Sequence, residues 1–353
     1  MSDLKGLRVV VAGAGAIGSV LALQLVRGGA EVVLADAAAP GGNASGVAAG
    51  MLAPLFETLL DAPSAALYPL LLRSRDAWPA LMPSLALDRS GALLKAALPE
   101  TAEALAARAA ALGARAQVMD AAGARALAPG LVGEGSYLFT GEDWRLAPGG
   151  ALNALHGAFE ALGGVRLAAN VLGLDGGLAR FDAAAAWAAD AVILATGPKA
   201  GEWRDAGIAP LTPIKGQILR FPGLGPATGP VVRGEGVYVA PSSGGLVVGA
   251  TMEEGRSDLA IDPEAVDRLQ AAAARLFPQL AAATAIASAG VRAATSDGAP
   301  VVGLTAQPGV LVARGARRNG WLLAPLIAEV VIGHLLGHAH DAAARAFDPA
   351  RFG

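Results

Sequence analysis

The sequence predicts a mixed α/β (α+β) fold, in which an antiparallel sheet with a substrate-binding role is inserted into a Rossmann-like nucleotide-binding domain. Two observations carry this prediction. The chain opens with a strand, a glycine-rich turn, a helix and a second strand, which is the order of a parallel βαβ unit. Between Lys215 and Met252, short alternating runs are separated by Pro and Gly, as is typical of antiparallel strands. At 353 residues the chain has room for about two domains.

The elements follow from periodicity and from turn residues. The opening unit is predicted as a strand at 7–12, a helix at 17–27 and a strand at 31–35. Further helices are predicted at about 66–82, across the alanine-rich residues 100–127, and at 149–162, 263–277 and 320–336. Further strands are predicted at 191–196, 217–221, 231–233, 237–240, 245–250, 288–292 and 310–314, with a hairpin turn at 241–244.

The first and last thirds of the chain together make one α/β unit, so the domains are expected to be discontinuous. We assign residues 1–85, 145–212 and 286–353 to the nucleotide-binding domain. The substrate-binding domain is then formed by residues 86–144 and 213–285.

Composition excludes several classes of function. The formal net charge is −3 and no basic stripe is present, so no nucleic-acid partner is expected. With no cysteine, the chain has no disulfide, no thiolate catalysis and no cofactor linked through sulfur. The uncharged run between Arg8 and Arg27 is interrupted by glycines and lacks a cleavage site, so we expect no membrane segment and a cytoplasmic protein.

The four histidines lie outside every motif. His156 falls in a predicted helix, and His334, His338 and His340 cluster near the C-terminus. A cluster of this kind is more often a solvated face than a ligand set, so we predict neither a metal site nor a histidine base.

A dinucleotide fingerprint occupies the first turn, where it follows a strand and opens a helix. Its glycines allow a tight turn, close approach of a pyrophosphate and close packing of helix on strand. Asp36 follows the second strand and can bind a ribose hydroxyl, which disfavours a 2′-phosphate. The fingerprint alone does not separate FAD from NAD. Its residues are Gly13, Ala14, Gly15, Ala16, Ile17 and Gly18.

Six segments, in the same order along the chain, resemble the D-amino acid oxidase family, and within it the glycine oxidases of the thiamine pathway. They are ASGVAAGMLAPLFE (44–57), ATGP (195–198), PIKGQ (213–217), VYVAPSSGGLVVGATME (237–253), AGVRAATSDGAPVVG (289–303) and RGARRNGWLLAP (314–325). The resemblance implies a flavoprotein that binds FAD non-covalently. Beyond the fingerprint and Asp36, it implies cofactor contacts from Ser45, Ala48, Ala49, Gly50, Met51, Val171, Thr196, Gly197, Arg318, Asn319, Gly320, Trp321 and Leu322.

The resemblance also implies a catalytic set of Arg292, Tyr238, Arg318 and Met51. Arg292 lies in a small-residue strand, where a buried guanidinium needs an anionic partner. From the residues alone that partner could belong to a structural salt bridge, whereas in the family the matching Arg binds the substrate carboxylate with help from the Tyr hydroxyl. From the residues alone, a core Met at a helix N-terminus is the favoured interpretation of Met51. A solvated loop charge is the alternative for Arg318, and it fits Arg317 better.

The implied activity is oxidation of glycine or another small amino acid to its imine, with O₂ reduced to H₂O₂, in thiamine thiazole biosynthesis. The resemblance also suggests a homo-oligomer. Departures from the family pattern leave D-amino acids, sarcosine and a dehydrogenase open; they lie at Asp143-Trp144-Arg145, Pro198-Lys199, Ala293, Ala316-Arg317 and Trp321. A nicotinamide-linked dehydrogenase and a catalytically silent flavin-binding protein are the alternatives from other classes.

Overall fold

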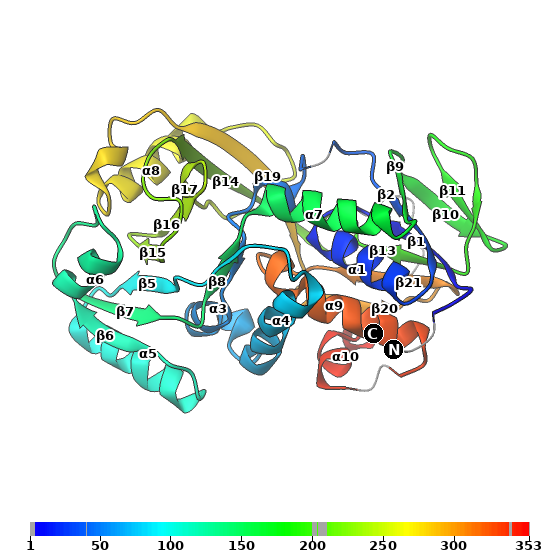
Figure 1. Cartoon of the computed structure of the whole chain (residues 1–353), viewed down its shortest axis with the longest axis horizontal. Helices are drawn as coiled ribbons and strands as arrows, with labels where there is room; N and C mark the ends of the chain where they lie inside the picture. Colours follow the sequence, from blue (N-terminus) through cyan, green and yellow to red (C-terminus); the bar gives the residue numbers. More distant parts are fainter. Residues whose placement is uncertain (1–3, 40, 200–202, 204–209, 339–340, 353) are drawn as a thin grey trace.

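The computed structural model describes residues 4–39, 41–199, 203, 210–338 and 341–352. Two large sheets lie at opposite ends of the long axis, and helices near the middle of the molecule lie between them (Figure 1). This arrangement agrees with the predicted mixed α/β class.

The first sheet is mainly parallel and carries the N-terminal unit. Its strand order is β20-β21-β13-β1-β2-β9. The strands are β1 (Arg8–Ala12), β2 (Glu31–Ala35), β9 (Val165–Leu167), β13 (Ala191–Leu194), β20 (Val301–Leu304) and β21 (Val310–Arg314). The apolar centre of β1 is completely buried because α1 (Ala16–Arg27), α7 (Pro148–Ala161) and α9 (Gly320–Leu335) pack nearby in the same core. The carboxyl ends of β1 and β2 therefore meet at the glycine-rich turn.

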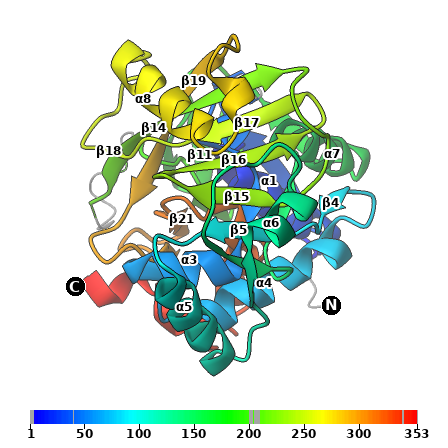
Figure 2. The ribbon, with the colours of Figure 1, turned by 90° about the vertical axis from the view of Figure 1, so that its left-hand side faces the viewer.

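The second sheet is mainly antiparallel, with the order β18-β14-β17-β16-β15-β5-β7-β6 and with β19 also paired to β14. Figure 2 shows α8 (Pro263–Ala274) above strands β14 to β17, and α3 (Pro54–Leu60) and α5 (Pro99–Ala111) below them. The strands are β5 (Ala92–Lys95), β6 (Gln117–Asp120), β7 (Ser136–Thr140), β14 (Thr212–Pro222), β15 (Val231–Gly234), β16 (Val237–Ser242), β17 (Gly245–Gly249), β18 (Glu253–Glu254) and β19 (Ile286–Ala294).

Smaller elements complete the fold. Two three-stranded sheets are formed by β10 (Val171–Asp175), β11 (Leu178–Phe181) and β12 (Trp187–Ala188), and by β3 (Met51–Leu52), β8 (Trp144–Leu146) and β4 (Leu87–Asp88). The remaining helices are α2 (Ala44–Val47), α4 (Tyr68–Leu81), α6 (Ala121–Leu127) and α10 (Ala342–Phe347), with 3₁₀ turns at Ala62–Ser64, Pro278–Leu280 and Pro349–Phe352.

One feature differs from the sequence prediction. Residues 100–127 are not one helical region, because β6 separates α5 from α6 and pairs with β7. Asp120 ends this strand and starts α6 by accepting the Gly123 N–H, so a single polar residue breaks the alanine-rich run. Strand β19, at the start of the stretch 286–353 that we assigned to the nucleotide-binding domain, pairs with β14 along nine positions of the antiparallel sheet. None of the helices in the described ranges is long and apolar enough to cross a membrane.

Candidate active site

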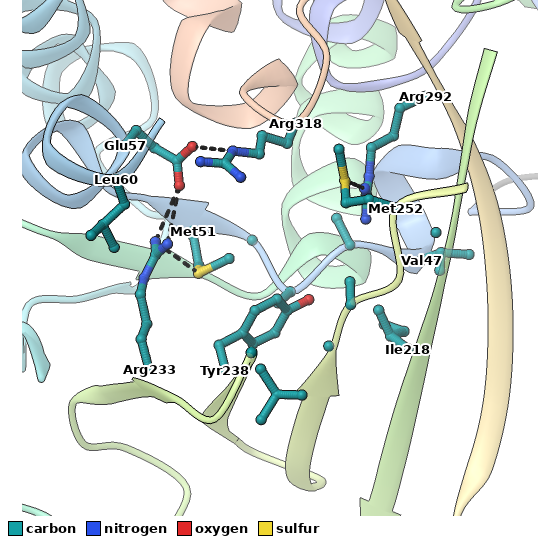
Figure 3. A pocket seen from close by; sticks show the side chains of 18 of the residues that line it. Val47, Met51, Glu57, Leu60, Ile218, Arg233, Tyr238, Met252, Arg292 and Arg318 are labelled. Atoms are coloured by element: carbon teal, nitrogen blue, oxygen red, sulfur yellow. Dashed lines mark hydrogen bonds and ion pairs between the residues drawn. The ribbon is translucent and has the colours of Figure 1, made fainter. Parts of the chain in front are cut away.

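A cavity of about 510 Å³ lies against the second sheet. It is bounded by the segment from α2 to α3, by strands β14 to β17 and β19, and by the start of α9 (Figure 3). Because these segments are far apart in sequence, only the tertiary structure brings them together into one site.

At the end of β1, the fingerprint glycines meet two close approaches of backbone. Gly13 has φ +106°, and a Cβ there would lie 2.4 Å from the Ala195 carbonyl oxygen. A Cβ on Gly18 would lie 1.9 Å from the Gly13 carbonyl oxygen. No larger side chain fits at either position, which is the packing that the fingerprint predicts. The first turn of α1 then offers N–H groups that have no acceptor within the helix.

Asp36 lies beside this turn. Its carboxylate accepts the Ala14 N–H at 2.8 Å and the Ala38 N–H at 2.9 Å. Both contacts use backbone, so Asp36 holds the turn against the end of β2. The contact with Ala14 could not be inferred from sequence spacing.

The segment after β2 is tied to both α1 and α9. The Ser45 hydroxyl accepts the Ala16 N–H at 2.9 Å, and the Ser45 carbonyl accepts the Trp321 indole N–H at 3.0 Å. Gly50 has φ +75°, and a Cβ there would lie 2.1 Å from the Leu146 carbonyl oxygen. The neighbouring Ala48 and Ala49 present small side chains to the cavity. A flat ring system can therefore lie against this backbone.

A buried arginine that sequence reasoning missed supports the loop after β13. Arg314 donates to the Gly197 carbonyl at 2.9 Å and to the Lys199 carbonyl at 2.9 Å. Burial lowers the pKa of Arg314 to about 10. The Thr196 hydroxyl also donates to the Lys199 carbonyl, at 2.7 Å. The signal in the sequence was a charged residue that ends the apolar strand at 310–314.

Arg292 faces the cavity from β19. Its guanidinium lies over Gly216, where a Cβ would be 2.3 Å from Nη2. In the described part of the chain no carboxylate pairs with it, and its Nη1 lies 2.8 Å from the Met252 sulfur. Burial lowers the pKa of Arg292, although it remains a cation at neutral pH. A structural salt bridge, the alternative that the sequence left open, is therefore absent among the described residues.

Tyr238 enters the cavity from β16, opposite Gly249 of β17. A Cβ on Gly249 would lie 2.3 Å from the Tyr238 hydroxyl, so the glycine makes room for the phenol. Burial raises the pKa of Tyr238, and the phenol stays neutral and able to donate a hydrogen bond. Figure 3 shows its ring between Met51 and Ile218.

A buried carboxylate, Glu57 of α3, joins two other arginines of the cavity. Arg318 Nε lies 2.5 Å from Glu57 Oε2, and Arg233 Nη2 lies 3.2 Å from Glu57 Oε1. Arg233 Nη2 also lies 3.5 Å from the Met51 sulfur (Figure 3). Neither Glu57 nor Arg233 was among the predicted site residues. The available signal was that Glu57 is the only acid in the motif at 44–57.

Arg317 corrects an interpretation from the sequence. We expected a solvated loop charge, but its guanidinium is largely buried and lies 2.6 Å from Asp61, which is also buried. Arg318 reaches the same Asp61 at 3.4 Å. The two arginines therefore share the carboxylate of Asp61. Only Arg318 lines the cavity.

Asp143, one of the departures from the family pattern, supports α3 from behind. Its carboxylate accepts the Leu55 N–H at 2.9 Å and the Phe56 N–H at 3.2 Å. Burial raises the pKa of Asp143 to about 6. Asp143 thus caps the helix that carries Glu57.

The other predicted positions lie close to this frame. Trp321 lines the cavity, while Asn319 and Leu322 are buried behind it and Gly320 begins α9. Val171 accepts the Trp203 indole N–H at 3.3 Å. Within the described ranges no group of three or more acidic or histidine side chains could hold a metal ion, and His340 lies outside those ranges.

These residues fit FAD. The glycine turn and the first turn of α1 suit a pyrophosphate, and Asp36 adjoins them at the end of β2. The small residues 48–50 line the cavity, where a flat ring system has room beside the backbone.

Comparison with known proteins shows which family the chain resembles. The family model described as DAO, FAD dependent oxidoreductase, matches residues 8–333. A glycine oxidase of Geobacillus kaustophilus is 29% identical, over 92% of this chain and 91% of that protein. The crystal structure of glycine oxidase from that organism superposes with a TM-score of 0.84, at 26% identity and 98% coverage of both chains.

Two further proteins are similar to this chain, one over nearly its whole length and one over less than half of it. Iminodiacetate oxidase from Chelativorans sp. BNC1 superposes with a TM-score of 0.85, at 25% identity, over 97% of this chain and 100% of that one. The tRNA 5-methylaminomethyl-2-thiouridine biosynthesis bifunctional protein MnmC of Caulobacter sp. strain K31 is 40% identical, over 42% of this chain and 25% of that protein. The matched stretches span less than half of the first three curated relatives. By the family match over most of its length, the chain belongs to the DAO family of FAD-dependent oxidoreductases.

Proposed function

We propose that the protein oxidises glycine or another small amino acid to the corresponding imine. Bound FAD would supply an acceptor for the hydride from Cα, and O₂ would then take up the two electrons and become H₂O₂. The single observation that carries the proposal is Arg292, a partly buried cation with no carboxylate partner among the described residues, which faces the cavity. The carboxylate of an amino acid would supply that partner.

The remaining cavity residues orient the substrate. The neutral hydroxyl of Tyr238 can donate a second hydrogen bond to the carboxylate held by Arg292. Arg318 and Arg233 are tied to Glu57, which holds both guanidiniums in place before a substrate arrives. A preorganised site of this kind needs no additional base if the amine binds in its neutral form.

An anaerobic substrate screen tests the proposal. We expect glycine or another small amino acid to bleach the flavin absorbance without O₂, and admission of O₂ to restore it with formation of H₂O₂. A purified protein without yellow colour would instead favour a nicotinamide-linked dehydrogenase. A yellow protein that no amine bleaches would indicate a silent flavin-binding protein.

A second substrate class has specific support. The cavity extends past Tyr238 to Leu60, Leu94 and Lys95, beyond the region that glycine would need near Arg292. N-substituted glycines could place their substituent there, and one similar solved structure is named an iminodiacetate oxidase. Sarcosine, iminodiacetate and D-amino acids therefore belong in the same screen. Bleaching by these compounds but not by glycine would assign the site to them.

We further propose that FAD is held non-covalently, since the chain has no cysteine to form a thioether. Acid precipitation should release the yellow colour into the supernatant, whereas colour retained in the pellet would show a covalent link. We also propose a cytoplasmic homo-oligomer that serves thiamine thiazole biosynthesis. Its discontinuous domains would be those assigned above, with β19 as the strand that joins the 286–353 segment to the second sheet.

A further inference from the structure

A line of polar side chains crosses the apolar core between β9 and the glycine-rich turn. Arg166 Nε donates to Glu160 at 2.7 Å, and Arg166 Nη1 lies 2.8 Å from His156 Nδ1. His156 Nε2 lies 2.9 Å from the Ser19 hydroxyl, which donates to the Ala14 carbonyl at 3.1 Å. We name these four side chains, Glu160, Arg166, His156 and Ser19, the α7–α1 relay.

Each hydrogen bond of the relay has a defined donor and acceptor. A guanidinium can only donate, so His156 Nδ1 accepts from Arg166 and the ring proton lies on Nε2. His156 Nε2 then donates to the Ser19 oxygen, and Ser19 directs its own proton to the Ala14 carbonyl. Burial, followed by the nearby charge of Arg166, lowers the pKa of His156, which favours this neutral ring. The order of donors is therefore fixed from the surface to the turn.

Packing alone does not explain these residues. Ser19 and His156 are both almost completely buried, and their neighbours Val20, Leu155 and Phe159 belong to the apolar core. A hydroxyl and an imidazole cost free energy in such surroundings unless each is fully hydrogen-bonded, whereas apolar side chains of similar size would pack without that requirement.

The relay ends on the peptide group that the fingerprint presents to a pyrophosphate. The Ala14 carbonyl and the Gly15 N–H belong to one planar trans peptide, so they point in opposite directions. Fixing the carbonyl toward Ser19 directs the Gly15 N–H away from the core. Asp36 holds the Ala14 N–H on the other side, at 2.8 Å. We propose that His156 is a positioning residue for FAD, acting through Ser19 on the Ala14–Gly15 peptide.

Binding to the apoprotein tests this proposal. FAD affinity is measured by flavin fluorescence, and ADP, which carries the pyrophosphate without the flavin, is measured by calorimetry. His156→Leu and Ser19→Ala should each weaken both ligands by about tenfold, the effect expected for one misplaced hydrogen bond. The double variant should be no weaker than the worse single variant, because both changes break the same relay.

Two further variants separate positioning from stability. His156→Gln should restore affinity to within about threefold of wild type, because its amide can accept from Arg166 and donate to Ser19. Ser74→Ala is the matched control: Ser74 is a buried helix serine that accepts the Leu326 N–H at 3.2 Å, far from the turn. This control should lower the melting temperature and leave both dissociation constants at their wild-type values.

The proposal is overturned if both ligands bind His156→Leu and Ser19→Ala as tightly as wild type. Independent, additive losses in the double variant would also overturn it, as would a Gln variant as weak as the Leu variant. If His156→Leu does not fold, the proposal is still tested by the other two variants. It then requires weaker binding of both ligands in Ser19→Ala and near wild-type binding in His156→Gln.

Discussion

Replacement of Arg292 tests the central feature of the site. In the structure its guanidinium lies over Gly216 and contacts the Met252 sulfur at 2.8 Å, with no carboxylate partner among the described residues. A substrate carboxylate would be its first charged partner and would displace the Met252 contact. Arg292→Ala removes the guanidinium that would bind the carboxylate, and Arg292→Lys keeps the positive charge without the planar fork.

The magnitude follows from the surroundings of Arg292. Truncating one member of a buried, hydrogen-bonded charge pair costs about 2–5 kcal/mol. Because the arginine must give up Met252 when substrate binds, we expect the lower part of that range, about 2–4 kcal/mol. This corresponds to a KM for the amino acid about 30-fold to 1000-fold higher in Arg292→Ala. In Arg292→Lys we expect a KM about tenfold higher, because one point charge replaces a bidentate contact.

The assay measures KM by peroxide formation, together with flavin content and melting temperature on the same preparations. Arg75→Ala is the matched control, because Arg75 is a buried arginine that pairs with Asp76 and Glu142 outside the cavity. The control should lose stability and keep its KM. If Arg292→Ala behaves like Arg75→Ala, Arg292 is a structural residue and the reasoning is refuted.

Three other predictions follow from single contacts. Gly216→Ala should raise KM about tenfold or more with the charge intact, since its Cβ would meet Arg292 at 2.3 Å; an unchanged KM would mean that the guanidinium can move aside. Asp36→Ala should weaken FAD binding about tenfold to a hundredfold, because it removes a charged acceptor from the Ala14 N–H and from the ribose hydroxyl that we expect Asp36 to bind; an unchanged FAD dissociation constant would contradict this. Burial raises the pKa of Asp143 to about 6, so the protonated form is favoured in the native state and its contribution is lost as pH rises from about 4 to 6. Relative to Asp143→Asn, the wild-type free energy of unfolding in urea should fall by about 2–3 kcal/mol over that range, and a constant difference would contradict the assignment.

The nucleotide-binding end could be predicted from the sequence because its determinants are local. The strand β1, the turn at Gly13 and the helix α1 follow one another directly, and each depends on residue types within a few positions. The hairpin between β16 and β17 is equally local, and its turn residues place it correctly. Six segments that resemble the D-amino acid oxidase family, in the same order along the chain, then predicted the family. The break in the run 100–127 was missed because β6 is stabilised by pairing with β7, which alanine content does not reveal.

The arrangement of charges in the cavity was decided by the tertiary structure. Arg318 and Glu57 are 261 positions apart, yet their side chains are in contact. Sequence showed that Arg292 needed an anion, but only the packing of β19 on β14 and the position of Met252 showed that the described chain provides none. His156 appeared to be an ordinary helix residue until α7 was placed against α1, within 2.9 Å of Ser19. Hydrogen bonds and ion pairs act over a few ångströms, so periodicity predicts which face a side chain occupies, whereas its partner depends on which distant segment packs against that face.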